Sequence, residues 1–364
     1  MKIKDIIKAI EAVAPRNYQE SYDNAGIQVG NPDSETNSAI ICIDITEEVI
    51  DEAIAKNINL IISHHPLIFK GIKSLTGKTY IERCVIKSIQ SNICLYAAHT
   101  NLDNARFGVN DFIAKKLGLS NISVLDPKPK MLAKLVTFVP FDYADKVREA
   151  LFNAGAGGIG NYDSCSYNSE GFGTFKAGEE CNPFCGKVGE IHKEKEIRIE
   201  VIMPLSIKNS IVSALLKSHP YEEPAFDIIA LENSWDACGS GILGELESPI
   251  DELSFLKDVK TVLGNVALRY STPRENKISK VAVCGGAGSF LIPNAISAGA
   301  DAFITGEIKY HDYFGNQDDI LLVEAGHYES EHLTMQLLKN ILNNKYPTFE
   351  TYITEVNTNP INYL

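Results

Sequence analysis

Two adjacent histidines, His64 and His65, stand at the end of a short apolar run and are the first residues whose types suggest a chemistry. The run 58–62 is bulky and partly β-branched, which is typical of a short buried strand. Pro66 follows the histidines and cannot continue a central strand. Neutral imidazoles at the end of a rigid strand are good ligands for borderline-soft divalent metals. The pair alone does not establish a metal site, because most histidines are simply hydrogen-bonded.

Two further histidines, each directly after a predicted strand, are followed four residues later by a carboxylate. The two pairs are His99 with Asp103, and His327 with Glu331. On the helix that begins near His327, Glu331 lies one turn further on and shares the same face. An imidazole and a carboxylate so placed can reach one metal centre.

Five possible nitrogen and oxygen ligands therefore follow strands or occupy the first turns of helices. They are His64, His65, Asp103, His327 and Glu331. Ligands of open α/β sheets bind at the carboxyl edge, where these residues are predicted to converge. Five such ligands without a thiolate exceed one tetrahedral site and suit two Zn, Mn, Fe or Mg ions about 3.5–4 Å apart. Such a pair would supply a hydroxide nucleophile near neutral pH, with Asp103 or Glu331 as the bridging ligand.

Other polar residues near predicted strand ends are candidates for supporting roles. His99 could ligate, donate a proton or orient a neighbour, and we favour orientation through a hydrogen bond. Glu307 and His311 follow the predicted strand 301–306 and could act as acid, base or orienting groups. The turn 285–289 resembles a phosphate-binding turn, but it lacks the full dinucleotide fingerprint, so tight packing explains it at least as well.

The eight cysteines are scattered along the chain, as expected of small buried hydrophobic residues in a reducing cytoplasm. Cys181 and Cys185 are close in sequence, but a structural zinc would need two more ligands and only His192 is near. We therefore interpret these cysteines as not forming a metal site.

Strands alternate with helices on both sides of the middle of the chain, which predicts mainly parallel, sandwiched sheets. In the first half we expect helices at 3–14, 47–56, 79–91 and 111–117, with Thr46 as a helix cap, and strands at 39–44, 58–62 and 92–98. In the second half we expect strands at 280–284, 301–306 and 320–326, and helices at 290–298 and 327–342. We expect the order strand–helix–strand–helix–strand–helix in both halves, which in the second half places a further helix between the strands 301–306 and 320–326. Any α/β protein shows such alternation, but the shared His-x-x-x-carboxylate offset favours two similar lobes.

Residues 129–233 interrupt the two lobes, which together form one core domain at 1–128 and 234–364. The interruption has a β-α-β-β-α-β-like order, which predicts a ferredoxin-like α+β insert. Its expected elements are strands at 132–140, 197–203 and 226–231, helices at 143–153 and 207–218, and a hairpin through 171–175. The glycine-rich stretch 155–160 could cradle an anion, but no P-loop Lys-Ser/Thr follows, which favours a turn.

Length and charge limit the possible functions. The 364 residues suggest two or three domains with a sizeable core. The formal net charge of −13 argues against a nonspecific grip on nucleic acid, although small anionic substrates held by a metal remain compatible. The first residues lack an apolar signal-peptide region and no apolar run is long enough to span a membrane, so we expect a cytoplasmic protein.

These residues together resemble the Nif-three-like dinuclear metal-centre family, also known as GTP cyclohydrolase 1 type 2 homologues. The matching motifs are Tyr22-Asp23-Asn24-Ala25-Gly26, Ser63-His64-His65-Pro66, Ala98-His99-Thr100-Asn101-Leu102-Asp103, Thr305-Gly306-Glu307 and Gly326-His327-Tyr328-Glu329-Ser330-Glu331. In the insert, Gly160-Asn161-Tyr162-Asp163 and His219-Pro220-Tyr221-Glu222-Glu223-Pro224 are similar to the longer bacterial members, whose middle domain resembles CutA-like and PII-like modules.

The resemblance implies that His64, His65, Asp103, His327 and Glu331 hold two divalent ions, zinc above all, in a ring-shaped homo-hexamer whose metal pairs face an internal cavity. The implied reaction is opening of the GTP imidazole ring with loss of formate, in which metal-bound hydroxide attacks C8 and His99 or His311 protonates the departing nitrogen. Two alternatives stay open. One is another metal-dependent phosphatase or phosphodiesterase, and the other is a non-catalytic, metal-stabilised ring that binds a partner or DNA.

Overall fold

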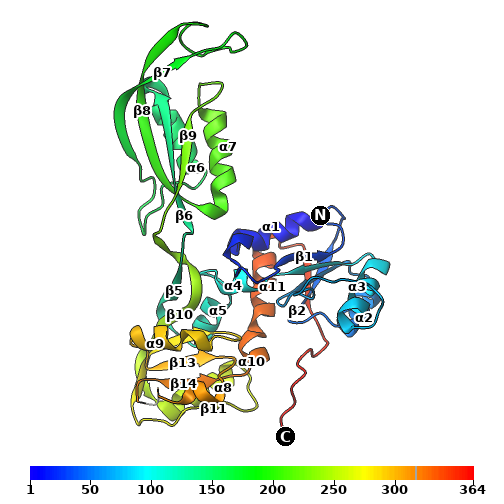
Figure 1. Cartoon of the computed structure of the whole chain (residues 1–364). Coiled ribbons are helices and arrows are strands. Elements are labelled where there is room, and N and C mark those ends of the chain that lie inside the picture. The colour runs from blue at the N-terminus through cyan, green and yellow to red at the C-terminus, as the bar shows by residue number, and fades with distance from the viewer. Residues whose placement is uncertain (316–317) are drawn as a thin grey trace. The chain divides into compact units, whose positions relative to one another are not determined.

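The computed structural model describes residues 1–315 and 318–364, and the chain divides into two compact units (Figure 1). The first, called here the core unit, comprises Met1–Pro127 and Asp236–Leu364. The second, called the insert, comprises Lys128–Trp235. The boundaries predicted for the insert, 129 and 233, lie within two residues of these limits.

A five-stranded sheet forms the first lobe of the core unit. Its strands, in spatial order, are β1 (Gly26–Val29), β4 (Cys94–Ala97), β3 (Leu60–Ser63), β2 (Ser38–Cys42) and β15 (Glu350–Ile353). The last four strands of this order are parallel, and β1 pairs antiparallel with β4. The helices of this lobe are α1 (Ile3–Val13), α2 (Glu47–Ala55), α3 (Tyr80–Gln90), α4 (Thr100–Asp103) and α5 (Val109–Lys116).

Local sequence explains how this lobe presents its strand ends. The Thr46 hydroxyl accepts a hydrogen bond from the Val49 N–H at 3.3 Å, which caps α2 directly after β2. All four residues of β3 are buried, because neighbouring strands flank it and a layer of apolar side chains, including Ile50 and Leu95, packs around it. The first residues beyond this buried strand are therefore held in a fixed place.

A six-stranded sheet forms the second lobe. Its strands, in spatial order, are β11 (Arg269–Tyr270), β14 (Leu321–Glu324), β13 (Ala302–Thr305), β12 (Lys277–Cys284), β10 (Ser234–Asp251) and β5 (Ser120–Pro129). The three central strands β12, β13 and β14 are parallel, whereas β11 pairs antiparallel with β14 and β10 pairs antiparallel with β12. The helices are α8 (Glu252–Val262), α9 (Ile292–Ser297) and α10 (His327–Glu331).

The two lobes repeat one arrangement of three strands. β2, β3 and β4 are parallel neighbours in chain order, and so are β12, β13 and β14. The helices of the repeat are not equivalent, and here the predicted alternation is wrong in one place. The segment between β13 and β14 contains the short 3-10 turn Tyr310–Tyr313, and the described residues there form no α-helix.

The end of the chain returns to the first lobe. Helix α11 (Leu333–Lys345) packs against α1 and α5, and β15 then adds to the edge of the first sheet beside β2. Figure 1 shows α11, in orange, beside the blue α1. The core unit is thus completed by residues that are far from the first lobe in sequence.

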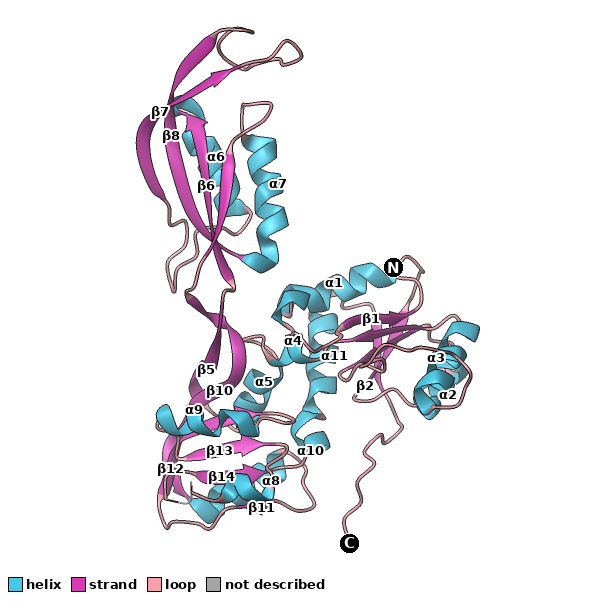
Figure 2. Cartoon of the chain, viewed as in Figure 1, coloured by secondary structure: helices cyan, strands magenta, loops and turns pink. Residues whose placement is uncertain are grey.

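The insert has the strand order β7-β8-β6-β9, and each strand pairs antiparallel with its neighbours. The elements are β6 (Leu132–Pro140), α6 (Ala144–Asn153), β7 (Tyr167–Lys176), β8 (Ile191–Pro204), α7 (Lys208–Ser218) and β9 (Phe226–Ala230). Both helices pack on one face of the sheet (Figure 2), where Leu151 and Leu215 join the same apolar cluster as Leu135 and Ile199. This order and layering confirm the predicted ferredoxin-like insert.

Among the residues described, no helix combines the length and the apolar character that crossing a membrane requires.

Candidate metal centre

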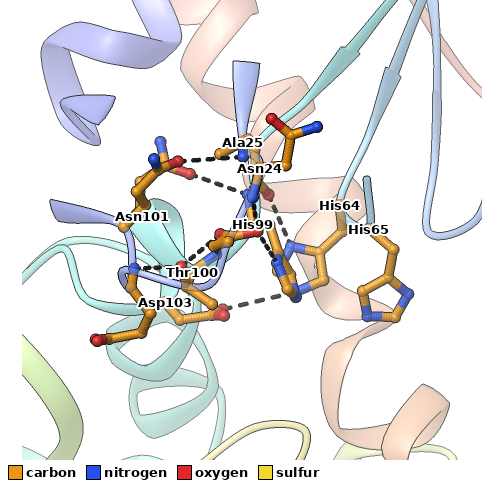
Figure 3. Close-up of polar contacts among 12 residues, drawn as sticks. Asn24, Ala25, His64, His65, His99, Thr100, Asn101 and Asp103 are labelled. Carbon is orange, nitrogen blue, oxygen red and sulfur yellow. Dashed lines mark hydrogen bonds and ion pairs between the residues drawn. The ribbon is translucent and has the colours of Figure 1, made fainter. Parts of the chain in front are cut away.

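His64 follows β3 and is fully buried. Its Nδ1 lies 2.8 Å from the Ala98 carbonyl oxygen, which can only accept, so Nδ1 carries a proton and, in the neutral ring, Nε2 carries the lone pair. Nε2 has no hydrogen-bond partner among the described residues. It lies 3.6 Å from Asp103 Oδ1 (Figure 3) and 3.7 Å from Glu331 Oε1. Ligands bonded to one divalent ion at about 2.0–2.2 Å stand roughly 3–3.6 Å apart, so this group fits an ion between its atoms.

The other two predicted histidine ligands are oriented in the same way. His65 Nδ1 lies 2.8 Å from Asp44 Oδ1, and His327 Nδ1 lies 2.8 Å from Glu307 Oε1. Their Nε2 atoms are 3.4 Å apart. A histidine that ligates through one nitrogen usually donates its other N–H to an oxygen, which fixes the ring. All three rings therefore present Nε2 to one place.

Glu331 is the carboxylate that links the histidines. Its side chain is 5% exposed, and its Oε2 atom lies 2.9 Å from His65 Nε2 and 3.2 Å from His327 Nε2. Burial alone would raise its pKa, but the surrounding histidines, His64 foremost, outweigh burial and hold the pKa of Glu331 well below its usual value. Burial dominates at Asp103 and raises the pKa of that carboxyl.

Neighbouring carboxylates raise the pKa of two of the histidines. Burial would lower the pKa of His65, but its hydrogen bonds to Asp44 and Glu331 raise it to about 10. The hydrogen bond to Glu331 is the largest cause that raises the pKa of His327, to about 9. A divalent ion would therefore have to compete with protons for the ring nitrogens of His65 and His327.

His99 lies beside His64 and His65, and a hydrogen bond to Asp23 holds its ring. Its Nδ1 lies 2.8 Å from Asp23 Oδ1, and Asp23 Oδ2 accepts a hydrogen bond from the Thr100 N–H at 3.1 Å. The His99 ring meets the rings of His64 and His65 edge-on, with centroids 5.4 Å from each. Three ring nitrogens, one from each of these histidines, lie within 4.8 Å of one another. Figure 3 shows His99 beside His64, with Asp103 on the following turn.

The glycine-rich turn 285–289 packs tightly against α10. Gly286 has a φ of +63°, and a methyl group there would overlap Glu331 Oε1. Its N–H donates to the Ser330 hydroxyl at 3.0 Å, and its carbonyl accepts the Gly306 N–H at 2.8 Å. Glycine is therefore needed for a left-handed turn and for close approach to the carboxylate. These contacts favour the packing interpretation of this turn over phosphate binding.

The structure brings together the five residues predicted as ligands, with Glu307 beside His327. His311 is different. It is exposed in the turn after β13, and its ring contacts within the described part of the chain are with Tyr310 and Phe314. Two orienting carboxylates were given no role in the sequence analysis: Asp44, and Asp23, which was named only within the motif 22–26. Asp44 follows β2 at the same sheet edge as His64, a position that could have indicated it.

Three comparisons place the chain among known proteins. The family model described as Duf34/NIF3 (NGG1p interacting factor 3) matches residues 1–360. The chain is 38% identical over 364 residues to a protein of Halalkalibacterium halodurans called "GTP cyclohydrolase 1 type 2 homolog", covering 99% of this chain and 98% of that protein. A Bacillus cereus protein described as related to NIF3 has a crystal structure that covers 100% of this chain and 99% of its own, with 35% identity and a TM-score of 0.86. The CutA protein of Archaeoglobus fulgidus aligns with 29% of this chain and 88% of its own length, at 15% identity and a TM-score of 0.22.

Proposed function

This chain belongs to the Duf34/NIF3 family, and on that premise we propose that it is a metal-dependent hydrolase whose His64, His65, Asp103, His327 and Glu331 hold two divalent ions. The observation that carries the proposal is the buried, unpartnered Nε2 of His64, which faces two carboxylate oxygens at 3.6 and 3.7 Å. A buried polar atom without a partner costs free energy, and a bound cation would remove that cost. Zinc is the preferred ion, because imidazole and carboxylate suit it; manganese, iron and magnesium are alternatives.

The proposed reaction class is hydrolysis. Two bound ions would supply an activated water and stabilise negative charge as the substrate is attacked. His99 would act as the proton donor, because Asp23 holds its Nδ1 and leaves the other ring nitrogen on the side of His64 and His65. Glu307 would orient His327. We assign no step to His311.

A nucleotide is the proposed substrate. The name of the Halalkalibacterium halodurans relative points to GTP, with ring opening and formate release as the sharpest form of the proposal. Two partly exposed aromatic rings support a planar base next to the centre. The Phe69 ring centroid lies 6.3 Å from that of His99 and 6.3 Å from that of Tyr22. Phe69 is 43% exposed and Tyr22 is 66% exposed, so both leave ring surface on which a base can stack.

The assembly proposed with this function is a homo-hexameric ring. This assembly is proposed because the family resemblance implies it. Light scattering coupled to size-exclusion chromatography tests it by measuring the mass of the particle in solution.

The experiment that tests the function begins with metal content. Wild type, His64→Ala and Glu331→Ala are purified without a chelator or an affinity tag and analysed for bound metals. We expect wild type to hold close to two ions per chain that are lost in both variants, in addition to any ion bound outside the core unit. His332→Ala is the matched control, because this neighbouring imidazole bonds to the Glu329 carbonyl and not to the centre.

The metal-loaded wild type is then incubated with GTP and with a simple phosphodiester. Formate release from GTP that is lost in Asp103→Ala supports the cyclohydrolase form, whereas phosphate or alcohol release alone supports a phosphatase or phosphodiesterase. An absence of bound metal even after reconstitution with zinc or manganese would overturn the hydrolase proposal and favour a binding scaffold.

A further inference from the structure

A second group of metal-ligating side chains lies in the insert, apart in sequence from the residues of the core-unit centre. Cys185, His192 and Glu194 each offer one ligand atom, and the three atoms lie within 4.8 Å of one another. We propose that these residues form a mononuclear site for a divalent ion of the zinc class. In the sequence, Cys181 and His192 were the only neighbours that suggested a site for Cys185, and the structure adds Glu194. The proposal does not depend on the proposed hydrolase function.

The β-strand explains why a glutamate two residues after the histidine belongs to the site. His192 and Glu194 are alternate residues of β8, so their side chains leave the same face of the sheet. His192 Nε2 lies 2.8 Å from Glu194 Oε2, and the two side chains are only 29% and 28% exposed. An imidazole and a carboxylate are thus already fixed as neighbours on a rigid element.

The loop between β7 and β8 brings the thiol over this face. Gly186, directly after Cys185, has a φ of +80°, and a methyl group there would come within 2.8 Å of the Cβ and Cγ atoms of His192. A residue without a side chain therefore lets the loop backbone lie against the imidazole. Cys185 Sγ lies 3.9 Å from the Tyr221 hydroxyl, and Cys185 is partly buried, so the thiol contacts the body of the insert. All eight cysteines of the chain are free thiols, so Cys185 is available as a ligand.

The donor set determines the class of ion. A thiolate, an imidazole nitrogen and a carboxylate oxygen together suit zinc, and the thiolate disfavours magnesium and calcium. Binding would transfer the Cys185 proton to solvent and form a bond from sulfur to the ion. Tetrahedral ligands of zinc stand about 3.4–3.8 Å apart. Ligand atoms as far as 4.8 Å apart would close by roughly 1 Å, and the His192 and Glu194 atoms, now 2.8 Å apart, would open by at least roughly 0.6 Å.

Three protein ligands leave a fourth position for water or an outside ligand, and a cavity adjoins the site. The cavity measures about 850 Å³ and is lined by residues that include Phe175, Tyr221 and Glu196. The Phe175 ring lies edge-on to His192 with centroids 5.4 Å apart, and the Tyr221 hydroxyl donates to Glu196 Oε1 at 2.7 Å. The ion would tie the 177–190 loop to β8 beside Phe175 and Tyr221, which line this cavity.

Cobalt(II) titration of the full-length reduced protein tests the proposal. Sulfur bonded to cobalt gives a charge-transfer absorption band in the near ultraviolet, and the five proposed ligands of the core unit contain no sulfur. We expect this band to grow to saturation at one thiolate-bound cobalt per chain and to disappear when zinc is added. Cys185→Ser and His192→Ala should each lose the band, and Glu194→Gln should require more cobalt to reach it.

Cys181→Ser is the matched control, because this exposed thiol belongs to the same loop but not to the group. It should keep the band, and circular dichroism should show that all variants are folded. Absence of the band in wild type, its persistence in Cys185→Ser, or its loss in Cys181→Ser would each overturn the proposed ligand set. Because the band reports sulfur ligation alone, its absence would leave the metal content of the core unit unaffected, so the two proposals fail separately.

Discussion

His65 and Glu331 are 266 residues apart in the chain, yet His65 Nε2 lies 2.9 Å from Glu331 Oε2. His65 follows β3 of the first lobe, and Glu331 ends α10 of the second. Neither lobe alone contains the group of ligating side chains. The centre is therefore a product of tertiary packing between two similar halves, and substitutions that act on its orienting residues should affect it without removing a ligand.

Asp44 orients His65, so removing its charge should weaken metal binding. In Asp44→Asn we expect the affinity of the core unit for zinc to fall about 10–100-fold, the usual cost of losing an orienting carboxylate. Competition with a coloured chelator measures this affinity. Asp33→Asn is a suitable control, because Asp33 pairs with Lys4 at the surface. Equal affinities in wild type and Asp44→Asn would contradict an orienting role.

Because of Asp23, the ion-free protein should lose stability as the pH falls below about 4. Burial would raise its pKa, but hydrogen bonds from His99 and Thr100 outweigh burial and lower the pKa from 3.8 to about 2. Because the folded-state pKa is depressed, the stabilisation is present above about pH 4 and is lost as the pH falls toward 2.

Urea unfolding of wild type and Asp23→Asn in chelator measures this effect. At pH 5 the wild type should be more stable by about 1.5–3 kcal/mol, as expected for hydrogen bonds to a charged group. The difference should shrink as the pH is lowered from 4 toward 2. A difference that stays constant over this range would show that the carboxylate charge is not the cause.

Gly286→Ala should disturb the centre by steric overlap. The new methyl group would meet Glu331 Oε1 and would also occupy a left-handed backbone position. We expect a loss of stability of about 1–3 kcal/mol and reduced metal content. Gly299→Ala separates the two causes, because Gly299 has a φ of +71° and a methyl group added there would meet no atom within 4 Å. It should lose stability but retain metal, and equal metal content in both variants would contradict the overlap.

Phe69→Ala tests the aromatic surface beside His99. If a nucleobase stacks there, removing the ring should raise KM roughly tenfold, within the range for loss of one base–aromatic contact, with kcat little changed. Steady-state kinetics with the nucleotide substrate give both constants. Phe107→Ala is the control, because Phe107 is 63% exposed and contacts Arg106 and Lys115 instead. An unchanged KM in Phe69→Ala would place the base elsewhere.

The sequence was sufficient for the strands that carry the ligands, because buried runs such as 58–62 and capped helices such as the one after Thr46 are local patterns. It was not sufficient for β15 or for the pairing of β5 with β10, because sheet edges depend on contacts between distant segments. His311 looked like a candidate beside Glu307, but the backbone after β13 turns and leaves its side chain exposed. The insert cluster was missed because Glu194 becomes a neighbour of Cys185 only when the loop folds onto β8.

The return of the chain to the first lobe has a consequence for biosynthesis. Helix α11 and strand β15 both follow Glu331 in the chain, so they are made after it. A nascent chain on the ribosome has His64, His65 and Asp103 long before it has His327 and Glu331. The first sheet still lacks its edge strand at that stage. The proposed pair of core-unit ions can therefore be bound only after residue 331 has been made, and a chain truncated before residue 327 should lack this pair.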